Sequence, residues 1–364
     1  MPKMAKFVFL FPSRQCQLTK HTTMVTSTST KEINVSYYLH HKKPLWNAIA
    51  FLYILTSYVG GIALLLLPNS FLNALGVVLL THSMVLSAYL THEFMHGTIF
   101  TDMKWNTVGG SIMLWLNGGC YGRFRDLAQE HIAHHINRVD FSAFNLPTFM
   151  NNLPSPIRKI VLALEWLYFP AISFIVQWRG IVAPFWQPQR KNERLRVTLI
   201  LLVRGVLFTV LGLVSLKALG LYFLSFIGMI LVLRLLDAFQ HTYEVFPVGT
   251  PLPKLDHAYE HSNTFTTLIS ERYWWLNLLL LNFGYHNAHH EIMKCPWHNL
   301  HELDREFAKK QNIHTLNLPQ LLRNYHRFRV DRIFLGQGQA ADERGNLQLD
   351  TFYGAVGVSM LVKF

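Results

Sequence analysis

Four long apolar stretches restrict this chain to a membrane fold. They cover residues 45–67, 71–90, 197–216 and 219–236. A helix of about 20 apolar residues crosses the ~30 Å hydrocarbon core of a bilayer, so each stretch is predicted to be a transmembrane helix. The composition agrees, because 51% of the residues are hydrophobic and 15% are charged.

Short connections pair these stretches into two helical hairpins. Pro68, Asn69 and Ser70 form the first connection, and Lys217 is the charged residue of the second. Basic residues gather instead on the opposite side, as in the run 189–196, which the positive-inside rule places in the cytoplasm. Both chain termini are therefore predicted to be cytoplasmic.

Other apolar or charged features near the membrane need separate treatment. Residues 108–119 would span only about 18 Å as a helix, so they are predicted to be re-entrant or interfacial. Residues 160–178 either lie in the interface or dip into the membrane, and both interpretations remain open. Charge inside a bilayer is costly, so Arg204 is expected to extend toward the surface and Arg234 to pair with Asp237.

Three histidine clusters are the strongest indication of a chemically active site in the chain. They read HEFMH at 92–96, HIAHH at 131–135 and HNAHH at 286–290. Residues three and four apart share a helix face, so each cluster directs its imidazoles together. The eight predicted metal ligands are His92, His96, His131, His134, His135, His286, His289 and His290.

Eight imidazoles exceed the four ligands of a tetrahedral zinc and suit a pair of metal ions with open positions. An all-nitrogen site favours a redox-active pair such as iron, although ligand type alone leaves manganese, zinc and copper open. The second apolar stretch runs directly into His92, which puts the first cluster at the membrane surface. All three clusters are predicted to lie on the cytoplasmic side.

The predicted fold is an all-α polytopic membrane protein. It has four transmembrane helices in two hairpins, interfacial helices, and a cytoplasmic helical cap that carries a histidine-rich dimetal site. Residues 1–43 are predicted to be an N-terminal extension, disordered and then interfacial, although a targeting segment within 1–31 remains an alternative. Residues 44–301 form the membrane domain, and 302–364 a cytoplasmic helical segment and tail.

The order and spacing of the three clusters resemble the histidine boxes of the membrane fatty acid desaturase superfamily, which includes related hydroxylases. The resemblance covers about residues 46–301. It implies two non-haem iron ions held by the eight histidines, dioxygen as co-substrate, and insertion of a double bond into a fatty acyl chain. The aromatic run 273–283 is too short to span, so it is predicted to lie along the interface and to form part of an acyl channel, with a plain core helix as the alternative.

Further polar residues enter through the same resemblance. Gln240-His241-Thr242 resembles an element of plant-type acyl-lipid desaturases, which makes His241 a ninth predicted ligand, or else a hydrogen-bonded neighbour of the site. His257 and His261 are assigned as residues that orient the ligands, or as alternative ligands. Glu93 is assigned to orient an imidazole.

The implied partners are a fatty acyl lipid, acyl-CoA or acyl-carrier substrate, and membrane lipid. The chain has no His-Pro-Gly-Gly segment of a fused cytochrome b5 and no cysteine cluster for iron–sulfur. Electrons are therefore expected from a separate donor such as ferredoxin or cytochrome b5. The net charge of +12 is assigned to loops that face anionic lipid and such donors, and no nucleic acid partner is expected.

Three alternative functions remain open. A lipid or alkyl hydroxylase would use the same diiron site. A membrane zinc metalloprotease would use His92 and His96 of the HExxH motif as zinc ligands and Glu93 as general base. A non-enzymatic metal-binding or lipid-sensing protein would leave its lipid unchanged when electrons are supplied.

Overall fold

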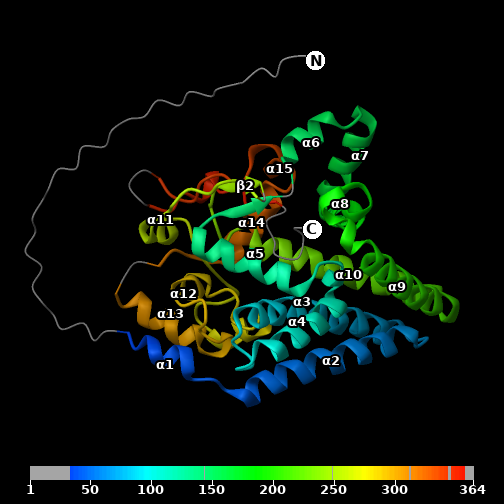
Figure 1. Ribbon diagram of the computed structural model, residues 1–364, viewed down its shortest axis with the longest axis horizontal. Coiled ribbons are helices and arrows are strands. Elements are labelled where there is room, and N and C mark those ends of the chain that lie inside the picture. Colours follow the sequence, from blue (N-terminus) through cyan, green and yellow to red (C-terminus); the bar gives the residue numbers. More distant parts are fainter. Residues whose placement is uncertain (1–32, 143, 248, 311–312, 343–345, 357–364) are drawn as a thin grey trace, which may run out of the picture. The chain divides into compact units, whose positions relative to one another are not determined.

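The computed structural model describes residues 33–142, 144–247, 249–310, 313–342 and 346–356. The predictions for residues 1–31 lie outside this set. The described chain belongs almost entirely to one compact unit, Asn34–Phe364, which is shown in Figure 1. This unit is mostly helical.

Four of its helices are long and apolar enough to cross a membrane. They are α2 (Pro44–Leu66), α3 (Ser70–His96), α9 (Arg194–Val214) and α10 (Leu216–Asp237). Each coincides with one of the four predicted stretches, and they follow one another as two hairpins. The prediction of an integral membrane protein with four spanning helices is confirmed.

The first hairpin is closely packed because glycines face each other across it. A Cβ atom on Gly76 would lie 2.9 Å from the Leu64 Cβ and 3.0 Å from the Gly61 carbonyl oxygen. Small residues at such a crossing allow two helix backbones to approach, as is common for helices in membranes. Helices α2 and α3 therefore lie side by side along the membrane segment (Figure 1).

The connecting ends of the two hairpins are joined by hydrogen bonds. Lys217 Nζ donates to the Leu67 carbonyl oxygen at 2.9 Å and to Asn73 Oδ1 at 2.8 Å. The Asn73 side-chain amide in turn donates to the Leu64 carbonyl oxygen at 2.8 Å. Lys217 thus satisfies the Leu67 carbonyl, which the end of α2 leaves free, and the Asn73 amide satisfies that of Leu64.

The shorter helix α4 (Met103–Asn117) packs against α3 and does not reach spanning length. Its 15 residues extend about 22 Å, which agrees with the prediction that residues 108–119 do not cross. It ends at Gly118, whose positive φ of 84° turns the chain through η1 (Gly119–Tyr121) into α5 (Phe124–Asn137). Arg204 donates to the Trp115 carbonyl oxygen near this end, so it is directed inward and not toward the surface as expected.

A bent helix pair packs against the second hairpin. Helices α7 (Ser155–Trp166) and α8 (Ala171–Trp186) meet at an angle of 118°. At the bend, Glu165 Oε2 lies 3.0 Å from Arg234 Nη2, and Glu165 Oε1 accepts from the Ile172 amide at 2.7 Å. Arg234 therefore pairs with Glu165, whereas the sequence had suggested Asp237, because the bend brings a distant carboxylate to α10.

The rest of the unit is built from short elements around two small parallel ladders. These elements are α1 (Val35–His40), β1 (Asp140–Ser142), α6 (Leu146–Asn152), η2 (Pro188–Glu193), β2 (Val245–Pro247), α11 (His257–Ser262), β3 (Thr266–Leu268), η3 (Trp274–Leu280), α12 (His286–Glu291), η4 (Trp297–Asn299), α13 (Leu300–Ala308), β4 (Thr315–Asn317), α14 (Leu318–Arg327), α15 (Arg332–Leu335) and η5 (Leu349–Thr351). Strand β1 pairs with β2, and β3 pairs with β4. The short strands were not predicted. Pairing of β1 with β2 places the segments that follow α5 and α10 next to each other.

Candidate metal centre

The three histidine clusters lie on the ends of three helices that meet in the protein interior. His92 and His96 occupy the last turn of α3, which ends at Gly97 with a positive φ of 69°. The second cluster forms the last turns of α5, and the third forms most of α12. A Cβ atom at Gly284 would clash with the Thr267 carbonyl oxygen, so this glycine permits the chain before α12 to approach β3.

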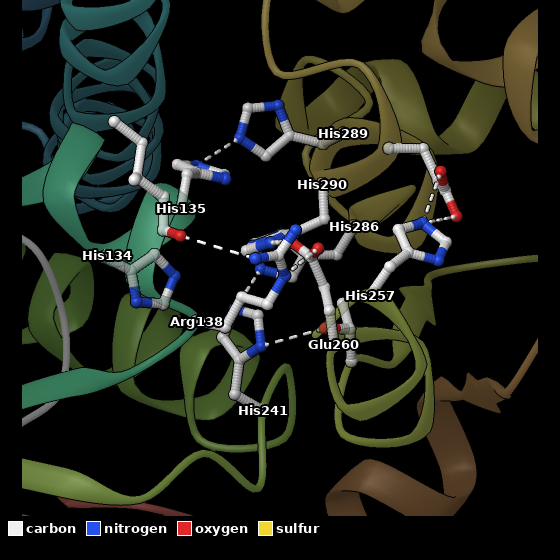
Figure 2. A network of polar contacts seen from close by, with 12 residues as sticks. His134, His135, Arg138, His241, His257, Glu260, His286, His289 and His290 are labelled. Carbon is white, nitrogen blue, oxygen red and sulfur yellow. Dashed lines mark hydrogen bonds and ion pairs between the residues drawn. The ribbon is translucent and has the colours of Figure 1, made fainter. Parts of the chain in front are cut away.

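Five histidines form the first group of possible ligands. Their ligand nitrogens lie within 4.8 Å of one another, and the members are His92, His96, His131, His135 and His289. Successive Nε2 atoms are close: 2.9 Å from His96 to His131, 3.2 Å from His131 to His135, and 3.1 Å from His135 to His289. The last of these contacts is drawn in Figure 2.

Three further histidines, His134, His241 and His290, form a second group with the same spacing limit. His286 lies beside this group, with its Nε2 atom 2.7 Å from the Nε2 atom of His241. Figure 2 shows His134, His241, His286 and His290 on the same side of the His135 and His289 pair. All nine histidines predicted as ligands are thus brought together.

The two groups are interlocked through neighbouring residues of one helix. His134 and His135 of α5 belong to different groups, and so do His289 and His290 of α12. Consecutive helical residues point about 100° apart, so an HxxHH sequence reaches two centres at once. The His135 and His290 rings lie 4.2 Å apart between centroids, where the groups meet.

Hydrogen bonds orient the second group. His134 donates its Nδ1 hydrogen to the Val139 carbonyl oxygen at 2.8 Å, which leaves the Nε2 lone pair directed inward. His290 Nδ1 lies 3.0 Å from Glu260 Oε1, and Glu260 Oε2 accepts from Arg138 Nε at 2.7 Å. Such outer partners fix the tautomer and orientation of metal ligands.

The nitrogens of the site fit metal ions better than they fit one another. A neutral imidazole nitrogen offers either one hydrogen or one lone pair. The His131 Nε2 atom approaches two other Nε2 atoms at once, and the buried His290 Nε2 atom has no hydrogen-bond partner within the described residues. A cation at the centre of each group would use these lone pairs.

Burial keeps the imidazoles outside the spanning helices in the neutral form that binds metals. Desolvation, followed by the charge of neighbouring histidines, holds the pKa well below its ordinary value. This applies to His131, His135, His286, His289 and His290. Protonation therefore does not compete with a metal at neutral pH.

The remaining predicted residues occupy different positions. Glu93 accepts from Thr98 Oγ1 at 2.7 Å and from the Trp297 amide at 3.1 Å, and its other oxygen is 3.5 Å from His92 Nδ1. The exposed His257 pairs with Glu291 at 3.0 Å, as Figure 2 shows. His261 belongs to neither group, and its ring lies 6.2 Å from that of His314.

Sequence reasoning missed Glu260 and Arg138. Glu260 stands between His257 and His261 in the HAYEH segment, where it is the residue that reaches the site. Arg138 ends α5 with a positive φ of 57°, three residues after the second cluster. A carboxylate one helical turn after His257, which was assigned to orient the ligands, was the signal that could have indicated Glu260.

Comparisons with known proteins agree with this geometry. A search of curated proteins gives no match. The family model described as fatty acid desaturase matches residues 68–317, a range that contains the eight histidines of the two groups and the neighbouring His286. The resemblance recognised in the three histidine clusters is confirmed, and the chain belongs to the fatty acid desaturase family, whose members are diiron oxidoreductases.

Proposed function

We propose that this protein is an oxygen-dependent fatty acyl desaturase that removes two hydrogens from neighbouring carbons and leaves a double bond. The observation that carries the proposal is the pair of interlocked, buried histidine groups. In this assignment His92, His96, His131, His135 and His289 hold one iron ion. His134, His241, His286 and His290 hold the other.

Two iron ions bound there would supply, with dioxygen, the oxidising power to break an unactivated C–H bond. The chain itself orients the ligands and excludes water. On one side of the first group the Phe283 ring lies 5.0 Å from the His92 ring and stacks on Tyr89 at 4.2 Å. This aromatic wall shields the site and supports a dry path for an acyl chain.

The family implies the substrate class, which is a fatty acyl chain. The proposed carrier of this chain is a lipid, coenzyme A or an acyl-carrier protein. Electrons are proposed to come from a ferredoxin or cytochrome b5, because the printed residues contain neither a His-Pro-Gly-Gly segment nor a cysteine cluster. The placement of the site and of both termini in the cytoplasm rests on the distribution of basic residues in the loops.

The geometry around Glu93 opposes the zinc protease alternative. A general base must be free to take a proton from a metal-bound water. Glu93 instead accepts hydrogen bonds from Thr98 and Trp297, and it lies at the junction of α3 and η4. Lipid hydroxylation uses the same metal site and is separated from desaturation by product analysis.

The test is gas chromatography–mass spectrometry of lipids from a host with a simple saturated and monounsaturated profile. The host would express the wild type, His290→Ala, or the control His257→Ala, which alters an exposed histidine outside both groups. We expect a new double bond in the lipids of hosts that express the wild type or the control, and none in the host that expresses His290→Ala. A new hydroxyl group would indicate a hydroxylase, and unchanged lipid despite bound iron and an added donor would refute the proposal.

A further inference from the structure

A cavity of about 420 Å³ lies between the C-terminal segment and the elements α6, α8 and β2. Its size is within the range of ~300–1,000 Å³ typical of ligand sites. Ile172, Val176 and Ile333 give it an apolar wall, and Arg332 supplies a cation. Helix α15, which carries Arg332, contacts α6 at this place (Figure 1).

The Arg332 side chain is fixed in the wall of this cavity. It is only 3% exposed. Its Nε and Nη2 atoms donate to the Phe328 and Tyr325 carbonyl oxygens, at 3.0 Å and 2.6 Å, and its guanidinium lies 4.2 Å from the Tyr325 ring centroid. The third nitrogen, Nη1, makes no hydrogen bond to a described residue.

The charge of Arg332 is not balanced by an ion pair with any described residue. Nearby, Glu165 and Arg234 form a buried ion pair in which the two opposite charges offset each other. Glu244 also lines the cavity, but its side chain is exposed and does not pair with Arg332. Burial lowers the pKa of Arg332 to about 10, so the guanidinium is still charged at neutral pH. The two carbonyl oxygens and the Tyr325 ring stabilise the guanidinium, but no carboxylate of the described residues forms an ion pair with it, so an anion in the cavity would complete its charge balance.

The cavity is adjacent to the second histidine group. Tyr243 lines the cavity, and its ring stacks on the His241 ring with centroids 4.1 Å apart. Gln337 also lines the cavity, and its Nε2 atom donates to the Tyr243 carbonyl oxygen. The buried Gln337 Oε1 atom has no hydrogen-bond partner within the described chain, so it is free to accept from a hydroxyl or amide group of a ligand.

We propose that this cavity binds the anionic end of the acyl substrate, a carboxylate or a phosphate, with Arg332 as its partner. The inference rests on the proposed function, because it concerns the same substrate. A guanidinium is well suited to pair with an oxyanion. The wall formed by Ile172, Val176 and Ile333 would contact the first methylene groups.

The test measures equilibrium binding of radiolabelled palmitate and of its uncharged methyl ester to the purified full-length protein in detergent. The wild type is expected to bind palmitate about tenfold or more tightly than the ester, because a charge-assisted hydrogen bond is gained. Arg332→Gln should remove this preference and leave ester binding unchanged, whereas Arg332→Lys should retain part of it. Equal binding of the two ligands by the wild type, or an unchanged preference in Arg332→Gln, would overturn the proposal.

Metal content and thermal midpoint show whether each variant folds. If Arg332→Gln does not fold, the Val176→Phe variant tests the site instead. The larger side chain fills the cavity without altering Arg332, so it should weaken the binding of both palmitate and its ester. Unchanged palmitate binding in Val176→Phe would contradict the site.

Two further probes identify the anion and separate this inference from the reaction. Dipalmitoyl phosphatidic acid that binds with the same dependence on Arg332 supports a phosphate-bearing substrate. If inorganic phosphate binds and this binding requires Arg332, while the protein shows no preference for palmitate over its ester, the cavity holds a free anion. That result would overturn the substrate role. A palmitate preference in a protein that forms no double bond would support this site and refute only the proposed reaction.

Discussion

Glu260→Ala tests whether the second histidine group is an independent metal site. Glu260 is 7% exposed and joins His290 Nδ1, at 3.0 Å, to Arg138 Nε, at 2.7 Å. Removing the carboxylate frees the His290 ring to rotate and to change tautomer. Loss of such an outer partner typically lowers metal affinity about 10- to 100-fold, or roughly 1.4–2.7 kcal/mol.

The assay is metal content per chain after dialysis against increasing concentrations of a chelator. The wild type is expected to keep two ions, and Glu260→Ala to fall to one at chelator concentrations that leave the wild type loaded. Glu260→Gln should lie between them, because His290 and Arg138 each use a different oxygen of Glu260 and the amide replaces one of these oxygens by a donor NH2 group. Glu306→Gln is the matched control, since this exposed carboxylate pairs only with Lys309 among the ion pairs of the described residues. If Glu260→Ala retains both ions as the wild type does, or loses both together, the division into two groups is wrong.

Three further changes test the packing. Gly76→Ala is expected to lower the thermal midpoint, with a cost of about 1–3 kcal/mol from overpacking, whereas Gly60→Ala, where a Cβ meets nothing within 4 Å, should be neutral or stabilising. Glu165→Gln should cost about 3–5 kcal/mol by leaving Arg234 buried without its charge partner, and a wild-type midpoint would show that the pair does not stabilise the bend. Burial raises the pKa of Asp304 from 3.8 to about 7, so the stability this group contributes is present below pH 3.8 and is lost as the pH rises through 7. Asp304→Asn should therefore raise the unfolding midpoint at pH 8.5 more than at pH 5.5, and equal shifts at both values would contradict the assignment.

The features encoded locally were predictable. The spanning helices follow from uninterrupted apolar runs, and α3 was expected to lead directly into His92. The nine proposed ligands follow from spacing within the clusters and from the family resemblance. These predictions needed only residues that are close in sequence.

The features that depend on tertiary contacts were not predictable. Arg138 and Glu260 are 122 positions apart, and no local pattern relates them. The division of His134 and His135 between two groups depends on how α5 is rotated against α12. Arg234 was likewise assigned to Asp237, which is close in sequence. In the structure the bend after α7 places Glu165 beside Arg234.

The order in which the ligands occur along the chain has a consequence for biosynthesis. Four of the five histidines of the first group lie at or before residue 135, whereas the second group has His134 alone until His241 is added. The ribosome therefore completes most of one centre long before the other. Since His289 and His290 come last and serve one group each, both centres become complete only when α12 has been synthesised. If each group holds one ion, an ion captured earlier would meet four nitrogens of a nascent chain, and correct loading of both groups would depend on events after the third cluster leaves the ribosome.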